Sequence, residues 1–236
     1  MIDNPLGAAE LAALRAYDTP TICNALEIVA PERRATGFTV EPLVCAFPEL
    51  PPIVGYARTA TIRAAEPAGR PAAEMRQQRL DYFRHLVAEP GPTVSVIQDL
   101  DGGRKAYGAF WGEVNSTIHQ SLGCLGTVTD GSVRDLDAVA TGFQFIADRI
   151  GPSHAHVHLV DFAVTVTVAG MVVQPNDLIH ADRHGAVVIP HEVARQVPAA
   201  ADLLGRREAV ILEACRQPGF DVEALGRAMA DADDIH

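Results

Sequence analysis

The chain has 236 residues, of which 48% are hydrophobic and 21% are charged, as is typical of a soluble globular protein with a substantial core. Its formal net charge of -11 argues against a nucleic-acid-binding surface, because such a surface needs clustered positive charge. The first twenty residues lack the pattern of a secretory signal, and no apolar run reaches the ~20 residues that span a membrane, so we expect a cytoplasmic protein with no nucleic-acid or membrane partner.

The first hundred residues are expected to alternate between helices and strands. Apolar residues recur at helical spacing near the start, whereas IVGYARTATIR and TVSVIQDL have the alternation and β-branched content of strands. The expected helices are residues 5–29, with a new start at Thr19-Pro20, and the segment whose apolar side carries Met75, Leu80, Phe83 and Leu86; the expected strands are 39–44, 53–63 and 93–100.

The next segment, AFWGEVNSTIHQSL, has an amphipathic pattern. Apolar residues four apart predict one helical stripe, with a polar side on the same helix. Residues 126–129 then form an expected strand, and Asp135 to Ala140 is expected to begin another helix. The apolar stripe is Phe110, Val114, Ile118 and Leu122, and the polar side is Glu113, Asn115 and His119.

The second half is expected to be rich in strands before a helical end. Strands are expected within 143–148, 156–173 and 177–190, with a hairpin turn at Asp182 to Gly185 and a helix from Glu192 to Met229. This order predicts a mixed α/β protein with layered sheets, organised as a single domain over residues 1–236 with helical N- and C-terminal segments.

Residues 126–135, GTVTDGSVRD, combine a strand, a glycine turn and a helix start, which is where open α/β sheets place ligands. Arg134 could hold a carboxylate through two parallel hydrogen bonds, and Asp135 could bind a divalent cation through oxygen. The alternative is structural: an aspartate at the start of a helix is favoured by the helix dipole.

A second candidate is WGEVN at residues 111–115. Gly112 would let the backbone approach a ligand, and the free amides of Gly112, Glu113, Val114 and Asn115 could bind a negative group. Glu113 could orient a water as a general acid or base. A glutamate at a helix start is again the structural alternative.

Both segments together resemble the RraA-like family, which includes 4-hydroxy-4-methyl-2-oxoglutarate aldolases and the regulator of ribonuclease activity A. The resemblance covers about residues 15 to 195 and implies a swivelling β/β/α three-layer sandwich that assembles as a homotrimer or homohexamer. The residues that carry it, in order, are Gly102-Gly103, Gly112-Glu113, Asp130-Gly131 and Val133-Arg134-Asp135, supported by 53–63 and 168–190.

For the site, the resemblance implies that Asp135 binds a divalent metal, Mg²⁺ or Mn²⁺, with water completing its shell. It also implies that Arg134 and the amides of Gly112 to Asn115 bind a 2-oxo acid and that Glu113 governs a catalytic water. The expected activity is that of a metal-dependent aldolase or decarboxylase, which cleaves a C–C bond of a small 2-oxo dicarboxylic acid through a pyruvate enolate. Oxaloacetate decarboxylation would use the same enolate. Regulator-type members lack an aspartate at position 135, so Asp135 favours an enzyme.

The sequence is also compatible with several alternatives. A regulatory protein without activity, or a hydratase that forms a similar enolate, could use the same fold. A Schiff-base aldolase would need Lys105, the single lysine of the chain. His154, His156 and His158 would share one face of a strand, as in a zinc or iron site, and Glu213 is a candidate for an acidic group contributed to a neighbouring subunit.

Overall fold

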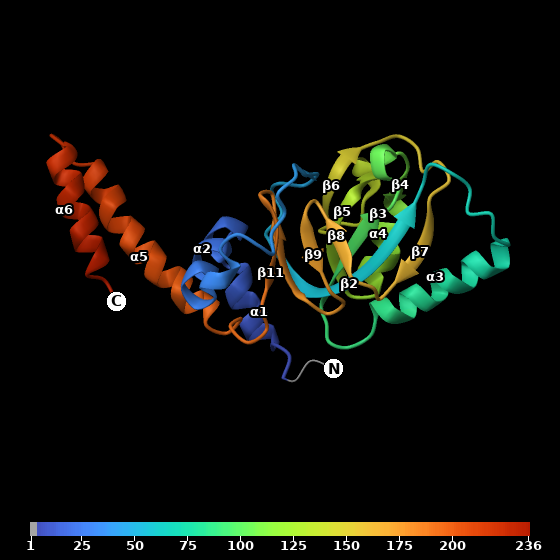
Figure 1. The fold of residues 1–236 in the computed structure, drawn as a ribbon, viewed down its shortest axis with the longest axis horizontal. Coiled ribbons are helices and arrows are strands. Elements are labelled where there is room, and N and C mark those ends of the chain that lie inside the picture. The colour runs from blue at the N-terminus through green and yellow to red at the C-terminus, as the bar shows by residue number, and fades with distance from the viewer. Residues whose placement is uncertain (1–3) are drawn as a thin grey trace.

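The computed structural model describes residues 4–236, and its centre is a large mixed sheet (Figure 1). The strand order is β1-β6-β5-β3-β2-β10-β11, with β4 beside β5 and β7 beside β2. Neighbours β2, β3, β5 and β6 run parallel, whereas β10 is antiparallel to β2. The strands are β1 (Val44–Cys45), β2 (Ile53–Arg63), β3 (Thr93–Asp99), β4 (Ala109–Trp111), β5 (Cys124–Val133), β6 (Gln144–Ile150), β7 (His158–Phe162), β10 (Leu178–Asp182) and β11 (Gly185–Ile189).

Two further layers cover the large sheet. Strands β8 (Val166–Val168) and β9 (Met171–Val173) form a small antiparallel sheet that packs on Val94 and Val96 of β3. Helices α3 (Ala72–Leu86) and α4 (Glu113–Ser121) lie on the side of Ser95 and Ile97. Alternate residues of β3 thus face different cores, as the period of a strand requires. The expected β/β/α layering is confirmed.

A third core joins the terminal helices to the hairpin of β10 and β11. Helices α1 (Ala8–Arg15) and α2 (Thr19–Val29) pack on these strands together with the start of α5 (Val197–Cys215). The carboxylate of Asp18 caps α2 by accepting a hydrogen bond from the Thr21 amide, as expected for a new helix start before proline. Beyond this core, α5 and α6 (Val222–Asp233) project away from the body (Figure 1).

The predicted stripe of the helix at 110–122 is wrong. Phe110 belongs to β4, and Val114 is 68% exposed. The buried side of α4 is instead polar, because Asn115, Ser116 and His119 find hydrogen-bond partners in the core. Buried polar groups are tolerated when they are paired in this way.

Several boundaries also differ from expectation. The segment after Asp135 forms only a single 3-10 turn, η3 (Leu136–Ala138), since Val139 is already extended. The strand expected at 126–129 is longer than predicted and extends over Cys124–Val133 as β5. The strand expected at 39–44 is shorter and consists only of Val44–Cys45, which is β1. The C-terminal helix is broken into α5 and α6, and other short helical turns lie at η1 (Pro31–Arg33) and η2 (Gly102–Arg104).

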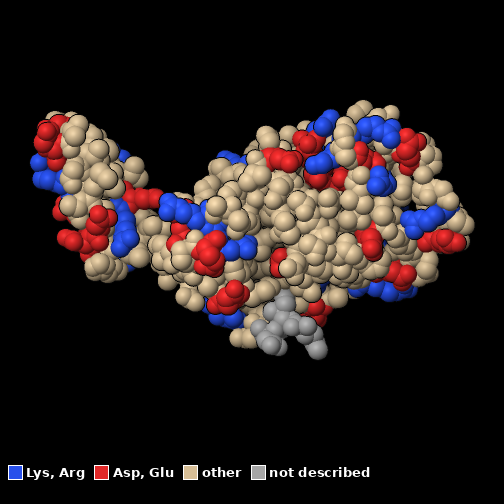
Figure 2. Space-filling view, in the orientation of Figure 1, with Lys and Arg blue, Asp and Glu red and all other residues tan. Residues whose placement is uncertain are grey.

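The surface carries mixed charge. On the face shown in Figure 2, acidic and basic side chains are interspersed over the body and over the projecting helices. Among residues 4–236, no helix combines the length and the apolar character needed to cross a bilayer. The hairpin turn expected at Asp182 to Gly185 is confirmed, with Asp182 paired to Gly185.

Candidate active site

The two candidate segments meet because β4 and β5 are parallel neighbours. Trp111 pairs with Val133 at the ends of these strands, and the Arg134 amide donates to the Trp111 carbonyl at 3.0 Å. Gly112 follows β4, and Arg134 follows β5. The carboxyl ends of parallel strands share one edge of a sheet, so residues far apart in sequence come together there.

Asp135 turns back toward Gly112. Its backbone is left-handed, with φ 56° and ψ 38°, a conformation that aspartate adopts more readily than most residues. A Cβ at position 112 would overlap Oδ2 of Asp135 and lie 3.2 Å from Cγ of Arg134. A side chain at residue 112 would therefore displace the Asp135 carboxylate from its present position.

The start of α4 faces the same carboxylate. The Glu113 amide lies 3.4 Å from Oδ2 of Asp135, and Nε of Arg134 lies 3.5 Å from the same oxygen. These long contacts leave the carboxylate, which is 34% exposed, able to accept further partners. The Asn115 side chain does not point to a ligand, because its amide donates to the Phe110 carbonyl and stabilises the turn before α4.

A hollow of about 300 Å³ opens beside this cluster. It brings together five of the six residues predicted for the site; Glu113 does not line it and is exposed. Arg79 and His154 also line it, although sequence reasoning gave no role to Arg79. The lining residues are Arg79, Ala109, Phe110, Gly112, Val114, Asn115, Arg134, Asp135, His154 and Val157.

The donor set fits a hydrated hard cation. Asp135 supplies an accessible carboxylate, and Mg²⁺ commonly binds through one or two carboxylates while it keeps several waters. Within residues 4–236 there is no group of three or more His, Cys, Asp or Glu side chains arranged to hold a metal. The chain thus offers a site with one carboxylate ligand and no closed cage of protein ligands.

Below the hollow, a buried hydrogen-bonded chain supports α4. His119 Nδ1 lies 2.6 Å from the Asn115 carbonyl, its Nε2 lies 3.0 Å from the Tyr82 hydroxyl, and that hydroxyl lies 2.9 Å from Ser95 Oγ. Burial lowers the pKa of His119 to about 4, so the ring is neutral near pH 7. Neutral imidazole donates at one nitrogen and accepts at the other, which matches these partners.

Lys105 lies in a different cluster. Its Nζ is 3.2 Å from Oδ2 of Asp130, whose Oδ1 accepts the Asp99 amide at 2.6 Å. Burial alone would lower the pKa of Lys105, but the charge and hydrogen bond of Asp130 outweigh it and raise this pKa. A protonated lysine is a poor nucleophile, and Lys105 does not line the hollow, so the Schiff-base alternative is disfavoured.

The other candidate residues, the histidines of segment 154–158 and Glu213, do not gather at the hollow either. Of His154, His156 and His158, only His158 lies on a strand, so the alternative of three imidazoles on one strand face is not formed. His154 alone lines the hollow, and its Nδ1 is 2.7 Å from the Ala155 carbonyl. Glu213 lies on the projecting α5, where it accepts a hydrogen bond from Gln217.

Comparison with known proteins gives a consistent family. The family model described as RraA-like, Aldolase/RraA, matches residues 19–188. The chain is 30% identical over 120 residues to the uncharacterized protein MJ0644 of Methanocaldococcus jannaschii. The matched region covers 50% of this chain and 58% of that protein. The chain is 29% identical over 102 residues to the "Putative 4-hydroxy-4-methyl-2-oxoglutarate aldolase" of Pseudomonas fluorescens, covering 42% of this chain and 62% of that one.

The fold is shared with a solved member of the same family. The crystal structure of RraAS2 from Streptomyces coelicolor, described as an unusual member of the RNase ES inhibitor RraA protein family, superposes with a TM-score of 0.68. The match has 20% identity and covers 88% of this chain and 98% of that chain. At this identity the likeness concerns the fold alone.

Proposed function

Because the chain belongs to the RraA-like family, whose members include aldolases and ribonuclease regulators, we propose that it is a divalent-metal-dependent lyase. It cleaves a C–C bond of a small 2-oxo dicarboxylic acid, as 4-hydroxy-4-methyl-2-oxoglutarate aldolases do, and decarboxylates oxaloacetate as a side activity. Both reactions leave a pyruvate enolate.

One observation carries the proposal: Arg134, Asp135 and the first turn of α4 converge on a single hollow. Each contributes a different interaction with an anionic substrate. The guanidinium of Arg134 can hold a carboxylate or oxo group by two parallel hydrogen bonds. The amides at the start of α4 would add positive potential at the position where the enolate charge develops.

Asp135 would hold the cation, which fits its accessible carboxylate. Mg²⁺ or Mn²⁺ bound there would supply a Lewis acid that polarises the 2-oxo group. Arg134, beside the same carboxylate, keeps the substrate oriented toward that position. Glu113, which is exposed in the first turn of α4 and does not line the hollow, would accept a proton from the 4-hydroxyl group through a water.

The test is pyruvate release from 4-hydroxy-4-methyl-2-oxoglutarate and from oxaloacetate, with Mg²⁺ and with EDTA. Turnover should require the metal and should fall to background in Asp135→Ala. Asp137→Ala is the matched control. Asp137 is an exposed aspartate two residues after Asp135, so this variant removes the same charge but leaves the proposed metal ligand in place. Metal-independent turnover, or an active Asp135→Ala variant, would refute the proposal.

The family also supports a second candidate, a regulatory protein without catalysis, because the structural relative belongs to a family of ribonuclease inhibitors. A hydratase that uses the same enolate is a third. Absence of turnover over a panel of 2-oxo and 2-hydroxy acids with Mg²⁺ would favour the regulator, and water addition without C–C cleavage would favour the hydratase.

We further propose that the protein assembles as a homotrimer or homohexamer. The support is the helical hairpin of α5 and α6, which projects from the body (Figure 1). Its exposed apolar side chains are Leu212, Val222 and Met229. Exposed apolar groups on one projecting element are typical of an interface between subunits. Light scattering after gel filtration should give three or six chains, and Val222→Lys with Met229→Lys should reduce that number.

A further inference from the structure

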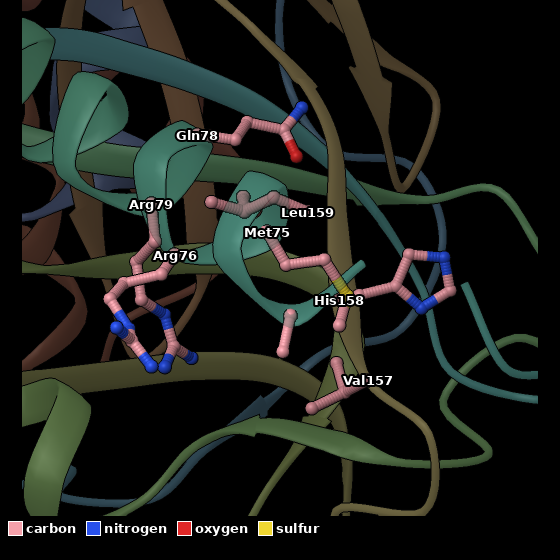
Figure 3. Close-up of a pocket in the computed structure, with 8 residues that line it drawn as sticks. Met75, Arg76, Gln78, Arg79, Val157, His158 and Leu159 are labelled. Carbon is pink, nitrogen blue, oxygen red and sulfur yellow. The ribbon is translucent and has the colours of Figure 1, made fainter. Parts of the chain in front are cut away.

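A second pocket adjoins the hollow along α3. Figure 3 shows it between this helix and the segment that leads into β7. Arg79 and Val157 line both spaces, so the two pockets are neighbours that share a wall. The second pocket is lined by Ala72, Met75, Arg76, Gln78, Arg79, Val157, His158 and Leu159.

Two arginines lie together at this shared wall. Arg76 and Arg79 are three residues apart on α3 and therefore on one helix face, and in Figure 3 their guanidinium groups point to the same end of the pocket. Like charges at this spacing repel each other unless an anion lies between them.

Neither guanidinium is paired with a carboxylate in the part of the chain that the structure describes. Among residues 4–236, Arg76 and Arg79 form no ion pair, whereas Arg84 on the same helix pairs with Asp81. This is notable in a chain with a formal net charge of -11, in which acidic partners outnumber basic ones. Arginine free of protein carboxylates is well suited to bind the carboxylate of a ligand.

The neighbouring wall is held in place. Gln78 donates to the Val160 carbonyl at 2.8 Å, and Arg70 donates to the Leu159 carbonyl at 2.8 Å, which ties α3 and its approach to β7. The charge of Arg79 also acts on α4. Burial is the main cause of the lowered pKa of His119, and the positive charge of Arg79 lowers it further. Arg79 therefore acts electrostatically on His119 of α4 as well as lining the hollow.

Resting on the proposed lyase function, we propose that Arg79, reinforced by Arg76, binds the second carboxylate of the substrate. The hollow then has two positive ends of different kinds. Arg134 and the start of α4 take the 2-oxo acid end beside Asp135, and Arg79 takes the distal carboxylate. The consequence is selectivity: the enzyme prefers 2-oxo diacids to 2-oxo monoacids of similar length.

The first experiment compares kcat/KM for a diacid, 4-hydroxy-4-methyl-2-oxoglutarate, with that for a monoacid, 4-hydroxy-2-oxopentanoate. In Arg79→Met the ratio of diacid to monoacid should fall by about 10- to 100-fold, as expected for loss of a charged hydrogen bond, and mainly through KM for the diacid. Arg76→Met should give a smaller fall in the same direction, and Arg79→Lys should recover part of the ratio. Arg84→Met is the control on the same helix and should leave the ratio unchanged.

The second experiment measures binding without turnover, by calorimetry with Mg²⁺, 2-oxoglutarate and 2-oxobutyrate. The wild type should bind the diacid at least about 10-fold more tightly, and Arg79→Met should remove that difference. If no substrate is turned over but the binding preference depends on Arg79, the lyase proposal fails and the carboxylate subsite stands. If turnover occurs but Arg79→Met affects diacid and monoacid equally, or if the wild type shows no binding preference, the subsite proposal is overturned.

Discussion

Gly112 and Asp135 occupy adjoining space, and the glycine is what admits the carboxylate: a Cβ at residue 112 would overlap Asp135 Oδ2. The two residues follow neighbouring parallel strands, so their proximity is fixed by the pairing of Trp111 with Val133. The candidate metal ligand thus depends on a residue that has no side chain.

Gly112→Ala should abolish turnover while the protein stays folded. The new methyl group forces the Asp135 carboxylate out of its position, and small displacements at a reacting centre lower rates steeply, by about 100-fold or more. Pyruvate release measures the effect, and circular dichroism checks the fold. Gly205→Ala in α5 is the control, since its Cβ meets no atom within 4 Å. An active Gly112→Ala variant would show that the position of Asp135 does not matter.

Glu113→Gln should lower kcat by about 100-fold or more, with little change in Mg²⁺ affinity, because a general base is lost while Asp135 is kept. The measurements are steady-state kinetics and metal titration. Glu223→Gln is the control, since Glu223 also lies in the first turn of a helix, α6, and loses the same interaction with a helix dipole. Unchanged kcat in Glu113→Gln would remove Glu113 from the mechanism.

Lys105→Met should keep lyase activity but reduce stability. The substitution leaves the buried Asp130 carboxylate, whose side chain is 3% exposed, without its cation. Since Lys105 itself is partly exposed, we expect a loss of about 1–2 kcal/mol in the free energy of unfolding, measured in urea. Borohydride should trap no adduct with substrate in the wild type. A trapped adduct that disappears in Lys105→Met would restore the Schiff-base mechanism.

Stability should fall as the pH drops from about 6.5 to 4. Burial lowers the pKa of both His119 and His180 to about 4 from 6.5, so the unfolded chain binds protons in this range that the folded chain does not. Each histidine corresponds to about 3 kcal/mol over the full range. The difference between the unfolding free energies at pH 7 and pH 5 should be smaller in His119→Gln than in the wild type. It should be smaller still in the double variant that also carries His180→Asn. An unchanged pH dependence in the double variant would contradict this origin.

The order of helices and strands predicts a mixed α/β protein with layered sheets. The three-layer sandwich and the meeting of the two motifs are implied by the resemblance to the RraA-like family. Residues 53–63 have the pattern of a strand and form β2 with the expected bounds. The side of α4 that faces the core could not be predicted from the sequence. His119 is buried because it pairs with Tyr82 of α3, and no local pattern of residues reveals that tertiary contact. Arg79 likewise joins the hollow through tertiary packing: it lies on an exposed helix face far from WGEVN in sequence.

Strand β2 has consequences for how the chain is synthesised. One of its edges pairs with β3, but the other is covered partly by β7 and partly by β10, which end at Phe162 and Asp182. A nascent chain that has emerged only as far as β6 therefore carries an open edge of eleven residues. Open edges recruit strands from other molecules, so the growing polypeptide is most prone to intermolecular strand pairing during this interval of translation.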